Sequence, residues 1–326
     1  MRRGFRVGGV MHIYQRTISG FNLFYSLTDF LVFYTIVSSQ ARKLKLCLLG
    51  MCLMIDHVHF LAFPDNLKQL SRFMSACTSL YVREFNTKTG RAGSLFEPRY
   101  GSAVKMDSKK IRSAIAYMFN NPVEKLLCRR AEEYRWNFLA YYNPPRLQKS
   151  QWRRYMSRAL RRSICVVDEL YRNGSYLKYA ILEKLYNGLN DSEQDVLTDY
   201  IITRYFPFAK DKVCGYFRSY DDMVMAINSN TGSEYEIAEM YYCKSDVPYR
   251  EMIRCLKKSG VTDARVLIVA PENTKRHYLS FLKSHTSASL MQIRKFLHMP
   301  STEDSGRTTQ DMRATDITLV IKNLDD

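Results

Sequence analysis

The chain has 326 residues, enough for two or three domains, and 46% of them are hydrophobic, as a globular core requires. Its 49 lysines and arginines against 32 aspartates and glutamates give a net charge of +17, which favours a polyanionic partner, most simply nucleic acid. The eight cysteines form no Cys-x-x-Cys pair, and we find no signal peptide and no apolar run near the ~18 residues of a membrane span. We therefore expect no zinc site and no membrane partner, and a cytoplasmic protein.

The first part of the chain alternates between strand and helix patterns. The patterns cover a strand at 10–19, a helix from 28 or 29 to 42, strands at 46–54 and 57–63, a helix at 67–86, and strand segments within 94–104 that are broken near Pro98 and Gly101. This βαββαβ order predicts an α+β fold, a ferredoxin-like antiparallel sheet with helices on one face.

Two histidines stand out in the third of these strands. His57 and His59 are two residues apart, so their side chains emerge on one face of the strand, while Val58 and Phe60 emerge on the other. Two imidazoles on one strand face can share a metal ion. The same pattern also fits a pair of half-buried polar residues on a sheet.

A third helix is predicted after these strands. Asp107 is suited to cap it, and Pro122 is expected to end it just before the proline. Tyr117 falls off the apolar stripe of this helix, and Asn121 lies one turn further on the same side. A tyrosine that is not needed for packing, next to an amide, is a candidate functional group, although the position taken alone favours a surface residue.

Four short motifs carry a family resemblance. They are His57-Val58-His59, the segment 93–100 (GSLFEPRY), the segment 117–123 (YMFNNPV) and Tyr134-Arg135-Trp136. In this order and at these distances they resemble the HUH-type single-tyrosine transposases of insertion sequences, and especially the REP-associated tyrosine transposases. The resemblance covers about residues 10–142 and implies an HUH catalytic domain in residues 1–145.

The resemblance implies a chemistry. His57, His59 and Asn121 would hold Mg²⁺ or Mn²⁺, with Glu97 and Glu124 as rival oxygen ligands. Tyr117 would attack a phosphate of single-stranded or hairpin DNA and form a 5′-phosphotyrosine, which a 3′-OH would reverse. The protein would act as a monomer or homodimer.

The chain departs from the family pattern at two places. Ile55-Asp56 stands where the family usually has Pro-Asn, and Asn137-Phe138 replaces a serine pair after the tryptophan. Asp56 either adds negative charge beside the metal or only forms the turn.

Basic residues in three segments are candidates for contacts with DNA phosphates. A solvated basic face would account for the same residues. The candidates are Arg99, Lys105, Lys109 and Lys110 in the first domain, Arg153 and Arg154 in a basic arm, and Arg294 and Lys295 near the C-terminus.

The second half of the chain contains no further catalytic motif. After Pro144-Pro145, residues 146–260 are expected to form a basic arm, or a charged linker, followed by a mainly α-helical region. Residues 261–300 resemble a helix-turn-helix with a recognition helix at 287–298, a pattern that any helical hairpin shares, and 301–326 form a polar tail. A non-catalytic, domesticated DNA-binding regulator of repeat elements is therefore the alternative function, and a relaxase with the same two-histidine strand is a weaker one.

Overall fold

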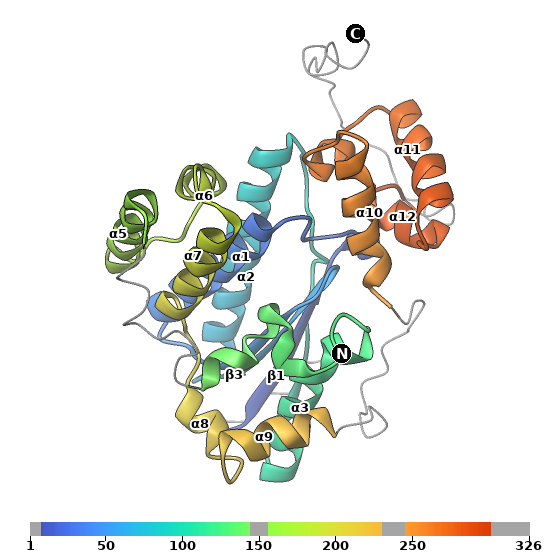
Figure 1. The fold of residues 1–326 in the computed structure, drawn as a ribbon. Coiled ribbons are helices and arrows are strands. Elements are labelled where there is room, and N and C mark those ends of the chain that lie inside the picture. Colours follow the sequence, from blue (N-terminus) through green and yellow to red (C-terminus); the bar gives the residue numbers. More distant parts are fainter. Residues whose placement is uncertain (1–7, 144–155, 230–244, 301–326) are drawn as a thin grey trace.

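The computed structural model describes residues 8–143, 156–229 and 245–300 of the chain. Four strands form one antiparallel sheet in the order β2-β3-β1-β4 (Figure 1). The strands are β1 (Val10–Arg16), β2 (Cys47–Leu53), β3 (His57–Phe63) and β4 (Gly101–Lys105), and the helices between them are α1 (Leu27–Lys43) and α2 (Leu67–Thr89). The predicted βαββαβ order and ferredoxin-like α+β fold are confirmed.

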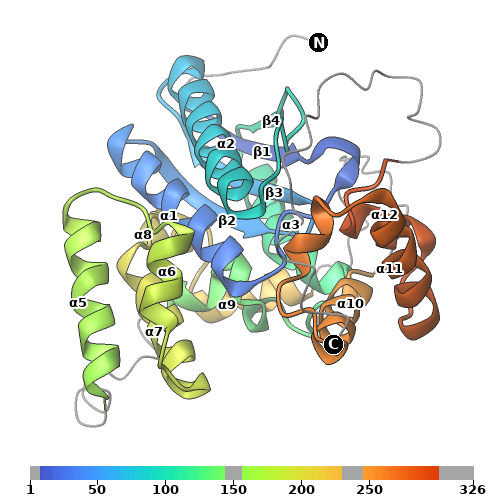
Figure 2. The same cartoon turned by 90° about the horizontal axis from the view of Figure 1, so that it is seen from above.

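Different helices cover the two faces of the sheet. Phe60 of β3 contacts aromatic rings of both α1 and α2, so these two helices share one face, as predicted (Figure 2). Helix α3 (Ser108–Glu124) lies on the other face, where a β-carbon on Gly50 of β2 would collide with side chains of α3. Because side chains alternate along β3, His57 and His59 lie on the face that α3 covers.

Local side-chain chemistry sets the ends of these helices. Asp107 caps α3 as predicted, and its carboxylate accepts a hydrogen bond from the backbone of the first turn. Helix α1 begins at a capping box of Ser26 and Asp29, earlier than expected, because the Asp29 carboxylate bonds back to the Ser26 backbone. Helix α2 runs three residues past its predicted end and stops at Gly90, whose φ of 72° is easily adopted by glycine.

The predicted strand segment at 94–100 does not form. Regular pairing starts only at Gly101, where β4 begins. The Arg91 side chain donates to the carbonyl of Ser94, and Pro98 has no N–H to contribute to a ladder. Only an isolated antiparallel bridge between Phe96 and Thr17 forms, where the Ile18 N–H donates to the Leu95 carbonyl at 3.0 Å and the Glu97 N–H to the Arg16 carbonyl at 2.9 Å.

Helix α3 extends past Pro122, although the sequence predicted that it would end before this proline. The helix passes through Pro122 and ends at Glu124, and the following turn closes on the carbonyl of Asn121. A proline in a helix removes a backbone hydrogen bond, but within the last turn only one bond is lost. Asn121 therefore stays helical, one full turn beyond Tyr117.

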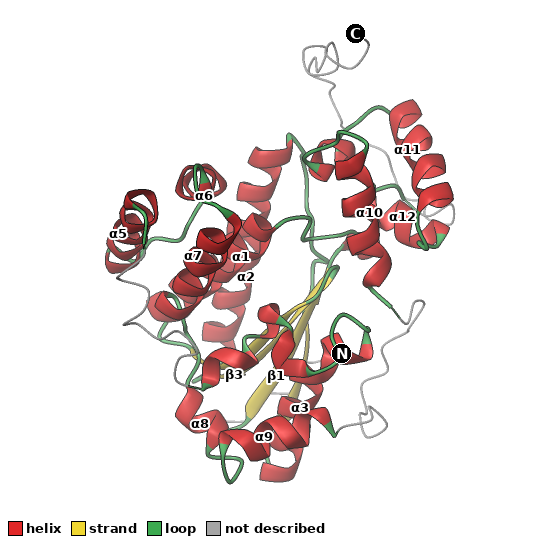
Figure 3. Ribbon diagram, viewed as in Figure 1, coloured by secondary structure: helices red, strands yellow, loops and turns green. Residues whose placement is uncertain are grey.

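The rest of the described chain is helical, as predicted (Figure 3). Short 3-10 helices are η1 (Ile18–Gly20), η2 (Ala131–Glu133), η3 (Arg135–Asn137), η4 (Leu139–Tyr142) and η5 (Ala264–Ile268). The α-helices are α5 (Arg158–Arg172), α6 (Tyr179–Tyr186), α7 (Asp191–Arg204), α8 (Lys210–Cys214), α9 (Tyr220–Asn228), α10 (Val247–Lys258), α11 (Glu272–His285) and α12 (Leu290–Phe296). The expected recognition helix at 287–298 is thus shorter than predicted, because Ser289 caps α12.

These helices pack against the sheet domain. The backbone N–H of Ala209 bonds to the carbonyl of Leu48 in β2 at 2.8 Å, and α9 lies along α3 (Figure 1). The buried carboxylate of Asp29 in α1 bonds to Arg265 of η5 at 2.8 Å. One apolar core extends from the sheet to Leu297.

Some predictions fall outside the described residues. These are the boundary at 145/146, Arg153, Arg154 and the tail at 301–326. Within the described residues, no helix combines the length and apolar character that crossing a membrane requires.

Candidate active site

Three histidines meet on the face of the sheet that α3 covers. In the pairing of β1 with β3, Tyr14 lies opposite His59, which places His12 on the same face two residues away. His12 Nε2 is 3.2 Å from His59 Nδ1, and the two rings stack with their centroids 5.3 Å apart. The rings of His57 and His59 meet edge to face at 4.9 Å. The predicted shared face of His57 and His59 is therefore present, with His12 added to it.

Tyr117 and Asn121 reach this cluster from α3. The Tyr117 ring stands edge-on to His12 at 5.6 Å and to His59 at 5.8 Å between centroids. The side-chain nitrogen of Asn121 is 3.5 Å from His59 Nε2. The fold thus brings Tyr117, His57, His59 and Asn121 together from two elements that are far apart in sequence.

The surface position that the helical pattern favours for Tyr117 is wrong. Its side chain is 1% exposed, and its hydroxyl oxygen is itself buried. The apolar stripe of α3 packs against one side, but every side chain from Ala114 to Pro122 is buried, because the sheet, η2 and α9 enclose this helix. A nucleophile placed here is shielded from solvent.

Burial sets the charge state of two of the histidines. Burial and the nearby charge of Lys105 lower the pKa of His12 to about 3. Burial, with the charges of His57 and His12, lowers the pKa of His59 well below its usual value. Both rings are therefore neutral at pH 7, the form in which imidazole binds a metal ion.

Asp56 is bonded to the first histidine of the strand. One carboxylate oxygen lies 2.6 Å from His57 Nδ1. Burial raises the pKa of the Asp56 carboxyl, but the His57 hydrogen bond and the charge of Lys295 outweigh it and hold that pKa below its usual range. A carboxylate on Nδ1 fixes the tautomer and orientation of the ring and leaves Nε2 as its ligand atom.

The C-terminal helices also reach this point. Lys295 of α12 places its ammonium 3.6 Å from the other carboxylate oxygen of Asp56 and passes so close to Gly20 that a β-carbon there would collide with it. Asp246, at the start of α10, is buried near the same group, and burial together with the Asp56 charge raises its pKa to about 6. The surroundings of Asp56 therefore include residues almost 240 positions further along the chain.

The donor set fits a hard divalent cation. In the described part of the chain, no three His, Cys, Asp or Glu side chains are grouped to hold an ion, and the amide of Asn121 is a further donor beside His59. The side-chain oxygen of Asn121 is buried with no hydrogen-bond partner among the described residues. Which end of the amide faces His59 is an assignment, and a flip brings that oxygen to the imidazole. Adjacent ligands of an octahedral ion with bonds of about 2.1 Å lie roughly 3 Å apart, close to the observed spacing.

The candidate DNA-contacting residues are spread over the molecule. Arg99 is exposed in the loop before β4, and Lys109 and Lys110 are exposed in the first turn of α3. Lys105 is half-buried at the end of β4. A guanidinium nitrogen of Arg294 bonds to the backbone carbonyl of residue 300. Their role in DNA binding stays a prediction, as do the rival ligands Glu97, which is exposed, and Glu124, which is half-buried.

Two other parts of the motif pattern have structural roles. The Tyr134 hydroxyl donates to the carbonyl of Leu53 at 2.8 Å, and Trp136 stacks on Phe30 of α1 with centroids 4.4 Å apart. Asn137, where the family has serine, donates from its side chain to the carbonyl of Phe119 in α3 at 3.0 Å. These contacts hold the end of the domain and α3 against the sheet.

His12 is the site residue that the sequence did not single out. Alternation along β1 places it on one face with Tyr14 and Arg16, but nothing in the sequence says which face meets the histidines of β3. The register between the two strands decides this, and register is a property of the folded sheet.

Comparisons with known proteins bear on the same region. Residues 15–121 match the family described as "Transposase IS200 like", a segment that runs from the end of β1 to Asn121 and includes Tyr117, His57, His59 and Asn121. This segment is therefore similar to IS200-like transposases. This confirms the resemblance to single-tyrosine transposases that the four motifs indicated.

One solved structure is also similar to part of the chain. It is a REP-associated tyrosine transposase bound to a REP hairpin, with 14% identity over 42% of this chain and 79% of that chain, and a TM-score of 0.36. A comparison with curated proteins found no significant match.

Proposed function

We propose that this chain is a metal-dependent transposase that cleaves and rejoins single-stranded DNA at hairpin or repeat elements. The observation that carries the proposal is the meeting of Tyr117 with His59 and Asn121 at one buried point, inside the segment that matches the transposase family. A net charge of +17 suits a DNA substrate.

In this proposal His57, His59 and Asn121 hold Mg²⁺ or Mn²⁺, which when bound supplies Lewis-acid polarisation of the scissile phosphate. The other side chains prepare these ligands. Asp56 orients His57 through Nδ1, and His12 orients His59 through its Nδ1. Each imidazole keeps Nε2 for the ion, and such supporting partners are typically worth 10- to 100-fold in metal affinity.

Tyr117 is the proposed nucleophile. Its phenolic oxygen forms a bond to phosphorus while the bond from phosphorus to the 3′-oxygen breaks, and the proton that the phenol loses is balanced by the one that the 3′-oxygen gains. The product is a 5′-phosphotyrosine and a free 3′-OH. Attack by another 3′-OH reverses the step and joins strands, so no external energy source is needed.

The test is capture of the covalent adduct. Full-length protein is incubated with Mn²⁺ and end-labelled single-stranded hairpin oligonucleotides from the DNA flanking its gene, and adducts that survive denaturing gels are counted. We expect Tyr117→Phe to abolish the adduct and keep DNA binding. Tyr14→Phe is the matched control, because Tyr14 lies on the same sheet face opposite His59. An adduct that persists in Tyr117→Phe and disappears in Tyr14→Phe would reassign the nucleophile.

A second candidate function is a non-catalytic DNA-binding regulator. The observation that favours it is the burial of the Tyr117 hydroxyl, which a phosphate cannot reach in this conformation. This candidate requires that no adduct forms with Mn²⁺ across the hairpin panel while the DNA is still bound.

A further inference from the structure

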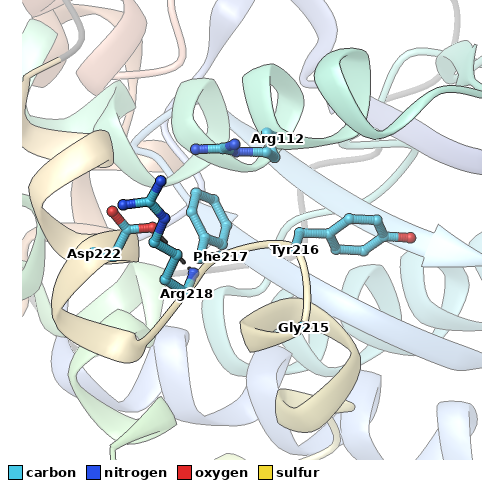
Figure 4. A pocket seen from close by; sticks show the side chains of 6 residues that line it. All are labelled: Arg112, Gly215, Tyr216, Phe217, Arg218 and Asp222. Atoms are coloured by element: carbon cyan, nitrogen blue, oxygen red, sulfur yellow. Dashed lines mark hydrogen bonds between the residues drawn. The ribbon is translucent and has the colours of Figure 1, made fainter.

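A pocket of about 400 Å³ lies between α3 and the turn that joins α8 to α9. Arg112 of α3 forms one side, and Phe217 and Arg218 approach it from the turn, while the Tyr216 ring points away from the two arginines (Figure 4). Its volume lies in the range of small-ligand sites. The lining residues are Arg112, Gly215, Tyr216, Phe217, Arg218 and Asp222.

The two arginines of the pocket carry available positive charge. Both are exposed, and among the described residues neither guanidinium has a carboxylate partner within ion-pair distance. The Asp222 carboxylate is instead bonded to the backbone N–H of Arg218 at 3.1 Å, as part of the start of α9. Two guanidinium groups against one carboxylate leave the lining with a net positive charge, and guanidinium groups are suited to bind phosphate oxygens.

An aromatic ring supports one of these cations. The Arg112 guanidinium carbon lies 5.1 Å from the centre of the Phe217 ring. A guanidinium plane held over an aromatic ring offers its outer side as a stacking platform, and unstacked bases bind arginine planes and aromatic rings in this way. The pocket therefore combines phosphate donors with a surface for a base.

The pocket lies beside α3, the helix that also carries Tyr117 and two of the candidate DNA contacts. Arg112 is five residues before Tyr117, which is about 7.5 Å along the helix axis and about 140° around it, so the two side chains face different sides of α3. Lys109 is three residues before Arg112, so the two side chains share one side of the helix. Lys105 of β4 pairs with Val10 of β1, two residues from His12 of the histidine cluster.

Five of the six residues that line the pocket lie outside the family match. The match ends at residue 121, whereas residues 215–222 belong to the helical region that follows. The feature is therefore specific to how this chain adds α8 and α9 to the transposase domain.

We propose that this pocket binds one nucleotide of the DNA strand, with its phosphate on Arg112 and Arg218 and its base stacked on the Arg112–Phe217 pair. The inference rests on the proposed function for the identity of the strand. It gives the C-terminal helices a part in binding DNA.

The test uses full-length protein and fluorescently labelled oligothymidylates of 10 and 30 nucleotides, with binding measured by anisotropy over a range of salt concentrations. We expect the double variant Arg112→Ala/Arg218→Ala to bind the longer strand at least tenfold more weakly at low salt. Its slope of log K against log salt should fall by about 1.4, since each phosphate contact of a single strand contributes roughly 0.7.

The matched control is Arg158→Ala/Arg161→Ala, which removes the same charge from exposed positions of α5, away from α9 (Figures 1 and 2). Equal losses in the two double variants, or none in Arg112→Ala/Arg218→Ala, would overturn the inference. A separate variant, Phe217→Leu, should weaken binding without changing the salt slope, because it removes the stacking ring and no charge.

Adduct formation at Tyr117 is scored separately with the hairpin panel. A specific loss of binding in the pocket variant supports the inference whether or not an adduct forms. An adduct with unchanged strand binding in that variant overturns the inference and leaves the proposed catalysis in place.

Discussion

Buried polar side chains are used differently in the sheet domain and in the C-terminal helices. In the sheet domain three of them meet at one point, where His12, His59 and Asn121 are each at most 1% exposed. In the C-terminal region Arg265 and His298 are buried at separate places, and each bonds to the sheet domain. Clustering, and not burial as such, therefore distinguishes the candidate site from structural polar contacts.

The largest expected effect is on stability, at the ion pair that joins Asp29 of the sheet domain to Arg265 of the C-terminal region. Arg265→Met leaves the fully buried Asp29 carboxylate without its cation and should lower the free energy of unfolding by about 3–5 kcal/mol. Urea denaturation measures this. The control Arg276→Ala breaks an exposed pair with Glu272 and should change stability by less than about 0.5 kcal/mol. Similar midpoints for the two variants would contradict a structural role for the Asp29–Arg265 pair.

The next largest effect is expected on metal binding at the histidine cluster of the sheet domain. Asp56→Ala removes the carboxylate that orients His57 and should weaken Mn²⁺ binding to the DNA-free protein about 10- to 100-fold. Isothermal titration calorimetry measures the affinity. Asp65→Ala, at an exposed position after β3, removes the same charge and should leave the affinity unchanged. If both variants bind Mn²⁺ like the wild type, Asp56 only forms the turn.

A third effect compares one buried histidine from each region. Burial lowers the pKa of His298 to about 3, as it does for His12, whereas an unfolded histidine titrates near 6.5. Between these values the unfolded state binds the extra proton, so stability falls as the pH drops below about 6.5, by up to about 1.4 kcal/mol per pH unit for each histidine. His298→Gln should reduce the slope of unfolding free energy against pH between 5 and 6 by that amount. An unchanged slope would mean that His298 is not buried in its neutral form.

The smallest effect is expected from removing a single cation in each region. Lys109→Ala in α3 should weaken binding of single-stranded DNA uniformly across sequences and lower the salt slope by about 0.7. Arg294→Ala in α12 tests the corresponding prediction for the C-terminal helices. Anisotropy titrations with the same oligothymidylate give both values, and a slope change only for Lys109→Ala would confine the DNA contact to the sheet domain.

Local chemistry explains which features the sequence predicted. The strand and helix order, the Asp107 cap and the one-turn spacing of Tyr117 and Asn121 depend on neighbouring residues, and the structure contains all three. The failed predictions come from packing. Pro122 continues a helix that is held on several sides, and Tyr117 is buried because other elements cover its side of α3.

The remaining site features involve residues far apart in the chain. The contact of His12 with His59 depends on strand register, and that of Lys295 with Asp56 joins residues 239 positions apart. No periodicity or local motif encodes such pairs. They follow from how the C-terminal helices pack on the sheet domain, which the composition of those helices does not determine.

The enclosure of Tyr117 has a kinetic consequence under the proposed function. A phosphodiester can meet a hydroxyl that is sealed from solvent only after the cover over α3 has opened. At saturating DNA concentrations, the rate of adduct formation then cannot exceed the rate of this opening, so adding more DNA does not speed the reaction. Under the proposed function, the free protein in this closed state would not cut DNA until a substrate that stabilises the open form is bound.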